Sequence, residues 1–429
     1  MGTLYWGVAI LVTLPSCKPI RMGHRRFTAA GAFAVMAVMA VCQAGSAHAL
    51  DGDRVRPFVG VVATYYSNLF YTDDRRPKVG AFTGVQSDLS YGLRGGIVAD
   101  YYMSRQVFTL NATATQSQFQ TNTALGNIAY NARGSMNWVV GSNWDGDLGA
   151  VFSENLGSFA DVRTQQKNLR TTQTLYGSAM YRVYYDWKLR TALTRTTLEN
   201  GAAQFRGGNR EDTIFELGSR YYSKGGDSFI GLNFKDTDGR FPNRVFVPGL
   251  SRVDSSYRQY DLQGTVDWRY SGETRISGAV GWTNRQHEQL SQRNFSGLTG
   301  RLTWNYVFSG KTSLSAAVFR EVGALEDVTT NYVLTQGFNV GPSYAVSGKL
   351  NVGATYNFNQ RKFLGDPGFI VTGAPRRVDD IQTLSVNVGY APARNVAINA
   401  ALSQSMRHSN ASFSNFSATT FTVTGQLTF

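Results

Sequence analysis

The sequence contains 429 residues, including 45 glycines, only 10 prolines and 13% aromatic residues. Its mean hydropathy of -0.24 excludes a protein built from helical membrane spans, since each span needs about 20 consecutive apolar residues. The net charge of +13 would ordinarily suggest a nucleic-acid partner. The export signal at the N-terminus argues against nucleic acid, so an anionic glycan or the phosphates of lipopolysaccharide are the expected partners.

The N-terminal region has the features of a secretory signal peptide. A basic start is followed by the apolar run Phe27 to Val41 and by a small-x-small cleavage site. A transmembrane anchor is the alternative, but the apolar run is too short for one and ends at a cleavage signature. We therefore expect residues 1–49 to be an N-terminal extension followed by the signal proper at 22–49. The start codon could encode Met1 or Met22.

The two cysteines indicate an exported chain that uses no thiol chemistry. Cys17 and Cys42 both precede the predicted cleavage site, so residues 50–429 contain no cysteine. Disulfides and thiolate metal sites are thereby excluded from the mature chain. We expect Sec-type export and a single domain over residues 50–429.

Side chains alternate between apolar and polar character from residue 55 to the C-terminus. In Val107 to Phe119, for example, Phe108 and Leu110 alternate with Thr109 and Asn111. A period of two is typical of strands with one apolar and one polar face, and no helical period fits it. Similar segments are Val55–Tyr66, Leu89–Met103, Ile128–Val140, Leu175–Trp187, Tyr260–Tyr270, Ile276–Trp282, Leu298–Phe308, Tyr332–Val340, Leu350–Phe358, Leu384–Tyr390 and Val396–Leu402. Weaker segments are Leu148–Phe159, Leu189–Thr197, Thr213–Tyr222 and Phe229–Lys235.

The connections between these segments alternate in length. Short turns are expected at sites such as Ser104–Arg105, Trp144–Asp147 and Gly341–Ser343, and longer polar loops at sites such as Ser67–Gln86 and Asp236–Asp254. This order is typical of an up-and-down barrel with tight turns at one rim and long loops at the other. Aromatic residues gather near the strand ends, where the interfacial girdles of a membrane barrel lie.

The final segment, Thr419 to Phe429, is the clearest strand. Its apolar residues Phe421, Val423 and Leu427 alternate with hydroxyl and amide residues, and Phe429 comes last. This ending resembles the C-terminal signature of bacterial outer-membrane barrels. The resemblance implies that Phe429 is a signal for the barrel-assembly machinery.

The fold class that follows is all-β, a transmembrane antiparallel up-and-down barrel of about 18 strands, with 16 possible. Strands can cross lipid only in a closed sheet, because every backbone amide and carbonyl needs a partner there. A barrel of this size has a lumen too wide for side chains to fill. We assign the polar face to the lumen, with Arg94, Arg133, Arg182, Arg220, Arg269, Arg275, Arg301, Asp100, Asp186, Glu216, Asp261 and Asp267 as its charged lining.

This lining supports two interpretations. Basic residues in a pore favour anions, so the lumen could be anion-selective. Alternatively, the charges only pair across the wall and keep the lumen hydrated. No catalytic, cofactor or metal site is recognisable, because Ser309–Thr312 lacks the first glycine of a phosphate loop and only His287 and His408 remain after cleavage. We therefore predict that the protein is not an enzyme and carries no cofactor.

The predicted mature chain resembles the exopolysaccharide-biosynthesis outer-membrane proteins of the EpsL type, within a wider group of barrel porins. The resemblance rests on Leu50-Asp51-Gly52-Asp53, Tyr65 to Phe70, the turns Tyr270-Ser271-Gly272 and Phe308-Ser309-Gly310, and Phe429. It implies an outer-membrane channel of a Gram-negative bacterium that helps an exopolysaccharide to leave the cell. A general solute or anion-preferring porin and a surface adhesin are the alternatives. The oligomeric state and the possibility of a loop that plugs the lumen stay open.

Overall fold

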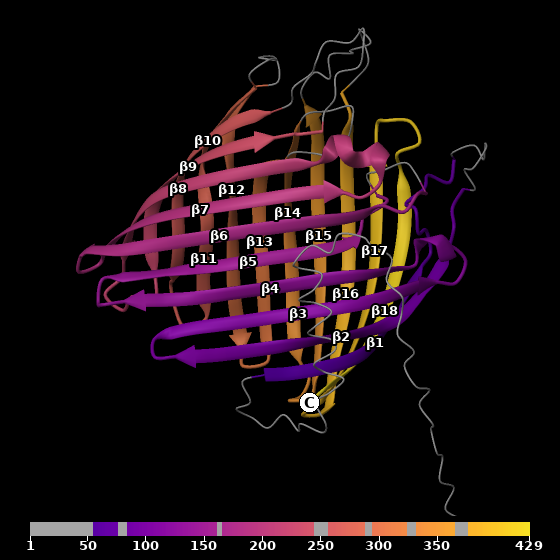
Figure 1. Ribbon diagram of the computed structural model, residues 1–429, viewed down its shortest axis with the longest axis horizontal. Coiled ribbons are helices and arrows are strands. Elements are labelled where there is room, and N and C mark those ends of the chain that lie inside the picture. Colours follow the sequence, from indigo (N-terminus) through magenta and orange to yellow (C-terminus); the bar gives the residue numbers. More distant parts are fainter. Residues whose placement is uncertain are drawn as a thin grey trace, which may run out of the picture.

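The computed structural model describes residues 55–75, 84–160, 165–243, 256–287, 294–323, 332–364 and 376–429. The predicted signal region, residues 1–49, lies outside this part of the chain. The described part forms 18 strands and two short 3-10 helices (Figure 1). They are β1 (Val55–Tyr66), β2 (Asp88–Met103), β3 (Gln106–Phe119), η1 (Thr123–Leu125), β4 (Asn127–Val140), β5 (Trp144–Leu156), β6 (Leu169–Tyr184), β7 (Trp187–Asn200), η2 (Ala203–Gly208), β8 (Arg210–Tyr222), β9 (Phe229–Arg240), β10 (Tyr257–Arg269), β11 (Thr274–His287), β12 (Phe295–Ser309), β13 (Thr312–Gly323), β14 (Tyr332–Ala345), β15 (Leu350–Leu364), β16 (Val378–Ala393), β17 (Val396–Ser409) and β18 (Phe416–Thr428).

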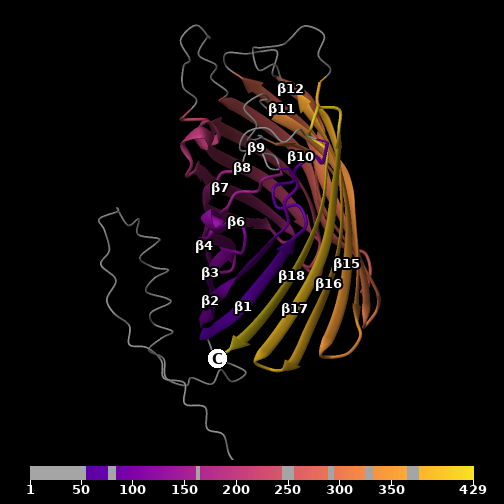
Figure 2. The same ribbon diagram turned by 90° about the vertical axis from the view of Figure 1, so that its right-hand side faces the viewer.

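The strands form one closed antiparallel sheet. Each strand pairs with its neighbours in the sequence, and β1 also pairs with β18 in a register that runs from Phe58–Thr428 to Tyr66–Thr420. Figure 2 shows β1 and β18 side by side between the two walls of the barrel. Closure satisfies the backbone groups of strands that would otherwise be edges. The predicted all-β barrel of 18 strands is therefore confirmed.

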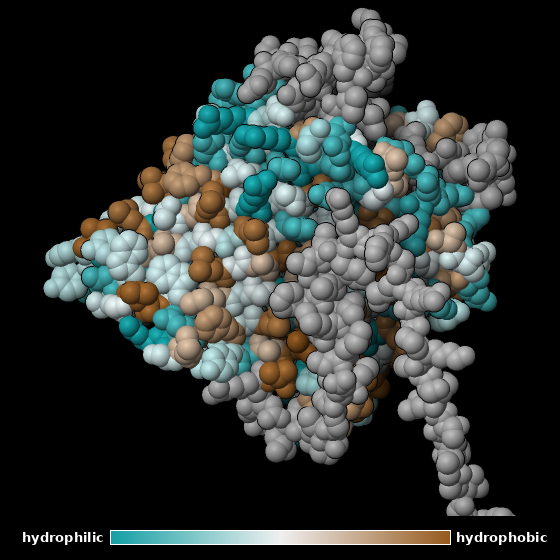
Figure 3. Space-filling model, viewed as in Figure 1, coloured by the Kyte–Doolittle hydropathy of each residue, from teal (hydrophilic) through white to brown (hydrophobic). Residues whose placement is uncertain are grey.

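The alternation of apolar and polar side chains shows that the apolar face of the sheet lies on the outside of the barrel. Leu93, Leu175 and Leu232 are more than half exposed although they are apolar, which is the arrangement expected of residues on an outer wall. Their sequence neighbours Arg94 and Thr174 point to the opposite, inner face. The register carries this phase from strand to strand and back to β1, and in the described ladders it shifts only next to the turns after β6, β12 and β16. On the face seen in Figure 3, brown residues lie over the middle of the strands and teal residues gather toward the long loops.

The two rims of the barrel differ. At the short-turn end, aromatic side chains of neighbouring strands contact each other on the outer face, as in Trp144–Tyr181, with ring centroids 4.7 Å apart. At the long-loop end, outward positions carry ion pairs such as Arg195–Glu211 and Arg258–Asp236. An apolar band next to an aromatic girdle is expected on the exterior of a barrel in a bilayer, and here the long-loop rim carries charged residues. Among the described residues, no helix is long and apolar enough to cross a membrane.

Three expected connections lie elsewhere in the structure. Trp144–Asp147 opens β5, and the turn before it is at 141–143. Gly341–Ser343 lies inside β14, because the ladder to β15 skips Gly341 and Pro342, so no bond is lost where proline has no N–H. The strand β9 continues through Arg240, so the loop expected from Asp236 begins later.

Candidate lumen and mouth

The ten lining residues expected from the sequence, together with Glu216, lie on inward-facing positions. Asp186, in contrast, falls in the turn between β6 and β7. Arg94 and Asp100 are on β2, Arg133 on β4, Arg182 on β6, Arg220 and Glu216 on β8, Asp261, Asp267 and Arg269 on β10, Arg275 on β11 and Arg301 on β12. On the inward-facing positions of the described strands, Lys and Arg outnumber Asp and Glu.

Three of the seven arginines have a carboxylate partner. Arg275 Nε lies 2.6 Å from Asp267, Arg301 Nε lies 2.8 Å from Glu321, and Arg269 Nη1 lies 3.7 Å from Asp227. For these three arginines, the geometry matches the interpretation in which the lining charges pair with each other along the wall.

Two of the lining carboxylates are also occupied. Asp100 accepts a hydrogen bond from Arg56 at 2.7 Å, and Asp261 accepts bonds from Thr283 and Gln259. Asp100 is therefore balanced by Arg56, whereas Asp261 is held by neutral donors and forms no ion pair with any of the seven arginines among the described residues.

Four arginines have no carboxylate partner among the described residues: Arg94, Arg133, Arg182 and Arg220. Arg94 stacks over the Phe58 ring at 5.3 Å, and Arg133 and Arg182 are exposed to solvent. All four come from β2 to β8, so these four unpaired arginines lie on one side of the lumen.

The strands β6 to β9 hold a basic patch that sequence reasoning found only in part. The patch consists of Arg182, Lys188, Arg190, Arg220 and Lys235 on the inner face. Arg182 is the register partner of Lys188, and Lys188 is the register partner of Arg220, so three cations stand directly side by side.

Two carboxylates contact this basic patch. Asp145 lies 2.6 Å from Lys188, and Glu216 lies 2.7 Å from Arg190 and 3.9 Å from Lys235. A cavity of about 180 Å³ opens beside Arg220. Because Arg182 and Lys188 flank the short turn at 185–186, their pairing could have been derived from the sequence. The contribution of Arg220 could not, because a long loop separates β7 from β8.

The opposite wall is uncharged over most of its depth. Below the rim, the inward-facing residues of β14 to β18 are Ser, Thr, Asn and Gln with small residues between them. Several hydroxyl groups bond to each other across strands, as in Ser385–Ser403 at 2.9 Å and Thr383–Ser405 at 3.1 Å. We call this surface the neutral wall. Charged and uncharged halves of the lumen thus present different chemistry to a solute.

An apolar cluster closes part of the lumen at the long-loop end. It consists of the buried side chains Leu69, Phe70, Phe119, Leu125 and Phe159, which come from three different loops or loop ends. The Phe70 and Phe159 rings meet edge to face with centroids 4.9 Å apart. Since Phe119 is on an inward-facing position, the loops turn into the opening. We call this group the mouth cluster.

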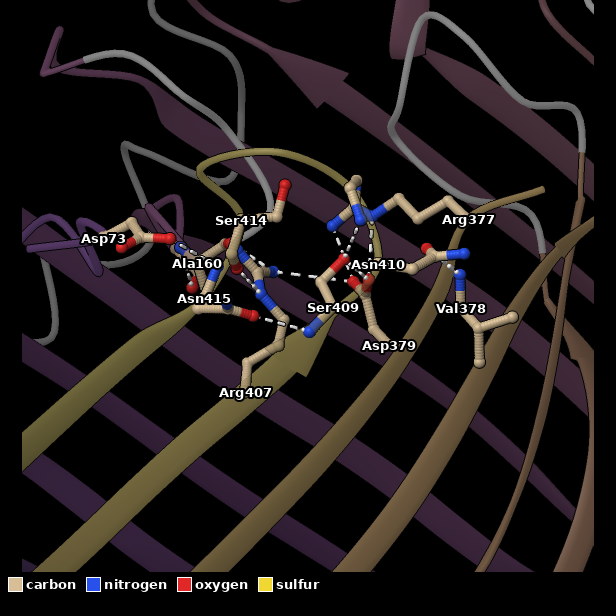
Figure 4. Close-up of polar contacts among 12 residues, drawn as sticks. Asp73, Ala160, Arg377, Val378, Asp379, Arg407, Ser409, Asn410, Ser414 and Asn415 are labelled. Carbon is tan, nitrogen blue, oxygen red and sulfur yellow. Dashed lines mark hydrogen bonds and ion pairs between the residues drawn. The ribbon is translucent and has the colours of Figure 1, made fainter. Parts of the chain in front are cut away.

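A polar network ties the mouth cluster to β17 (Figure 4). Arg407 donates from Nη1 to the Ala160 carbonyl at 2.7 Å and from Nε to the Ser414 carbonyl at 2.6 Å. Its guanidinium also stacks on Phe416 at 4.6 Å. Ala160 follows β5, and β18, β1, β2, β3 and β4 lie between β5 and β17 in the sheet. The bond therefore spans a section of the mouth.

A buried carboxylate anchors the other side of this network. The Asp379 side chain is fully buried and accepts hydrogen bonds from Arg377 at 2.6 Å and from Ser409 at 2.5 Å. The Arg377 guanidinium stacks on Phe363 at 4.2 Å. Charge-assisted bonds of this kind fix geometry more firmly than neutral ones. The long-loop end of β16 and β17 is therefore a rigid mount for Arg407.

Asp73, in the loop after β1, makes a second link to the last hairpin. Its carboxylate accepts hydrogen bonds from Arg75 and from the backbone N–H of Asn415. Burial by itself would raise the pKa of Asp73, but these bonds and the charge of Arg75 outweigh it and hold the pKa below its ordinary value of 3.8. In the same loop, burial raises the pKa of the Tyr71 phenol. Asp73 is thus a carboxylate whose ionised form stabilises the mouth.

Comparisons with known proteins address the fold alone. No protein-family model matches the chain, and no curated protein matches its sequence. The outer membrane protein OpdK from Pseudomonas aeruginosa is 12% identical, with 87% of this chain and 99% of that chain covered and a TM-score of 0.44. OccK2 (OpdF) from Pseudomonas aeruginosa is 11% identical over 87% and 98% of the two chains, with a TM-score of 0.47. OccAB3 from Acinetobacter baumannii is 11% identical over 87% and 99%, with a TM-score of 0.44.

Similarity at this level carries no argument about what passes through this chain. Because no family model matches, the exopolysaccharide assignment stays a prediction.

Proposed function

We propose that the chain forms a water-filled channel across the outer membrane that passes small polar solutes and favours anions. The closed sheet, the apolar band and the two distinct rims support the location in a bilayer. In that setting the short-turn end faces the periplasm and the long loops face outward. Outward arginines such as Arg195 and Arg258 would then lie at the level of lipopolysaccharide phosphates.

The observation that carries the anion preference is the set of unpaired arginines. Arg94, Arg133, Arg182 and Arg220 have no carboxylate partner among the described residues, so their charge acts on the lumen rather than on a neighbouring side chain. Charged rings and clusters in a pore set which ions enter it. Paired arginines such as Arg301 contribute less, because Glu321 cancels most of their field.

Planar-bilayer recording tests this function. Under a salt gradient, the purified protein should give channels whose reversal potential favours chloride over potassium. Replacing Arg133 and Arg182 by Gln should move the reversal potential toward zero. The double change Arg301→Gln with Glu321→Gln removes a pair without changing net charge and should leave selectivity unaltered, as should Arg195→Gln on the outer wall. Absence of conductance would refute the channel, and equal selectivity in all variants would refute the role of the unpaired arginines.

A second candidate function is passage of an exopolysaccharide chain, which the neutral wall favours. Hydroxyl and amide side chains can exchange hydrogen bonds with successive sugar hydroxyls without holding any one of them tightly. Deletion of the gene should then reduce polymer outside the cell and retain it inside. Normal secretion together with slower uptake of small solutes would leave only the solute channel.

A further inference from the structure

We propose that the basic patch binds the acidic groups of an anionic carbohydrate, and that three asparagines on the neutral wall take its hydroxyl groups. The proposal rests on the proposed channel and specifies its solute. It assigns a site at the short-turn end of the lumen, formed by Arg182, Lys188 and Arg220 on one side and by Asn351, Asn387 and Asn399 on the other.

The first argument is the energetic cost of the row Arg182, Lys188 and Arg220. In an antiparallel ladder, directly opposite residues have Cα atoms about 4.5–5.5 Å apart, and like charges at such positions destabilise the sheet. One carboxylate, Asp145, contacts this row. An unbalanced row of cations is therefore a place where a bound anion lowers the free energy of the folded protein.

The second argument is orientation. The Arg220 guanidinium stacks on the Phe229 ring at 4.3 Å and its Nη1 contacts Met180 Sδ at 3.7 Å. Lys188 Nζ lies over the Tyr222 ring at 5.2 Å. Aromatic rings thus hold both heads in place without accepting their strong hydrogen bonds. Among the described residues, no oxygen accepts a hydrogen bond from the guanidinium of Arg182 or of Arg220, so these side-chain donors are available to a carboxylate or a sulfate.

The third argument is the facing surface. The strands β7 and β16 are separated by the same number of strands in either direction around the closed sheet, so the basic patch faces β15 to β17. At the short-turn end of this wall, Asn351, Asn387 and Asn399 are exposed. The Asn351 side chain lies over Gly389, and the Asn387 side chain over Gly353. None of the three side-chain amides bonds to a described residue, and each offers a donor and an acceptor to a ligand.

These surfaces together select the class of ligand. A small anion would satisfy the cations and leave the amides unused, because a barrel of this size is far wider than one monosaccharide. An uncharged sugar chain would use only the amides. A chain of several sugar residues can reach from one wall to the other, with acidic groups on the basic patch and hydroxyl groups on the asparagines. An acidic oligosaccharide is therefore the occupant that the geometry favours.

Binding to the purified barrel in detergent tests the proposal without requiring conductance. Titration calorimetry should detect a short oligogalacturonate and show much weaker binding of a maltodextrin of the same length. The triple change Arg182→Gln, Lys188→Gln and Arg220→Gln should weaken binding of the oligogalacturonate by about tenfold or more, since hydrogen bonds to charged groups are stronger than neutral ones. Changing the three asparagines to Ala should weaken it about two- to fivefold, since neutral bonds contribute less.

Two controls define the result. Arg195→Gln removes an outward-facing arginine and should leave the affinity unchanged, and circular dichroism should show an intact barrel in every variant. Oligogalacturonate added on the short-turn side of a bilayer should also interrupt single-channel currents.

Equal affinity for inorganic phosphate and oligogalacturonate would overturn the proposal in favour of a simple anion site. Unaltered binding in the triple variant would overturn the assignment to the basic patch, while anion-selective conductance would still support the channel.

Discussion

Replacing Arg407 by Ala should loosen the long-loop mouth while leaving the barrel intact. The Arg407 side chain is only 5% exposed, and its guanidinium supplies the bond to Ala160 that links β17 to the loop after β5. The 18-strand ladder does not depend on this side chain. The change should therefore act on the loops and not on closure of the sheet.

The magnitude follows from the contacts that are lost. Without the guanidinium, the carbonyls of Ala160 and Ser414 lose their donors in buried surroundings, at a cost of roughly 1–3 kcal/mol each. Stacking on Phe416 adds about 0.5–2 kcal/mol. Water that enters the opened site offsets part of this. A net cost near 3 kcal/mol raises the ratio of open to closed mouth by roughly a hundredfold.

Two measurements check this expectation. Single-channel recordings of the Arg407→Ala protein should show a larger or more frequently open conductance than the parent. Limited proteolysis should cut the loops at 157–168 and 67–87 sooner, while the strands stay protected. Arg195→Ala, an exposed outward arginine, is the matched control and should behave like the parent. Identical conductance and identical cleavage rates for Arg407→Ala would refute the idea that this bridge restricts the mouth.

Three further outcomes are expected. The pKa of Asp73 is held below 3.8, so its contribution to mouth stability is complete above that pH and is lost as the pH falls through the lowered value. Protease sensitivity of the mouth should rise only below about pH 3.8 in the parent, and Asp73→Asn should reduce this dependence. Phe159→Ala should destabilise the mouth cluster by about 3–5 kcal/mol, seen as early cleavage of the loop after β5, and slow cleavage would contradict the packing. A Cβ at Gly281 would lie 1.9 Å from the Leu262 carbonyl oxygen, whereas a Cβ at Gly310 would meet nothing within 4 Å. Gly281→Ala should therefore lower the yield of folded barrel measured by circular dichroism, and Gly310→Ala should not. Equal yields would show that the β10–β11 ladder adjusts freely.

The fold could be predicted from the sequence because the alternation of apolar and polar side chains is a local property. Within each strand, neighbouring residues show which face is polar and which is apolar, as Thr422 and Val423 do in β18. The order of short and long connections then specifies a meander. The positions of turns were harder to predict, since Asp-Gly in β5 and Gly-Pro in β14 are dipeptides typical of turns but lie within strands. In these places strand pairing outweighs the local preference, since Asp145 and Gly146 pair with both neighbouring strands and Gly341 and Pro342 pair with β13.

The mouth could not be predicted, because its contacts join residues that are distant in the sequence. Arg407 and Ala160 are 247 residues apart, and Asp73 and Asn415 are 342 apart. No periodicity relates such positions. The net charge of the lumen lining had the same difficulty, since the ion pair between Arg301 and Glu321 is seen only once β12 and β13 are placed side by side.

The seam between β1 and β18 has a consequence for biogenesis. The two strands that complete the cylinder are the first and the last of the described chain, so every intermediate made before β18 is an open ribbon with two unsatisfied margins. Such margins recruit other strands and lead to aggregation unless a chaperone or a templating sheet covers them. Maturation should therefore proceed as a single late zippering event, and a polypeptide shortened by its final hairpin should accumulate as insoluble material and not as a narrower cylinder.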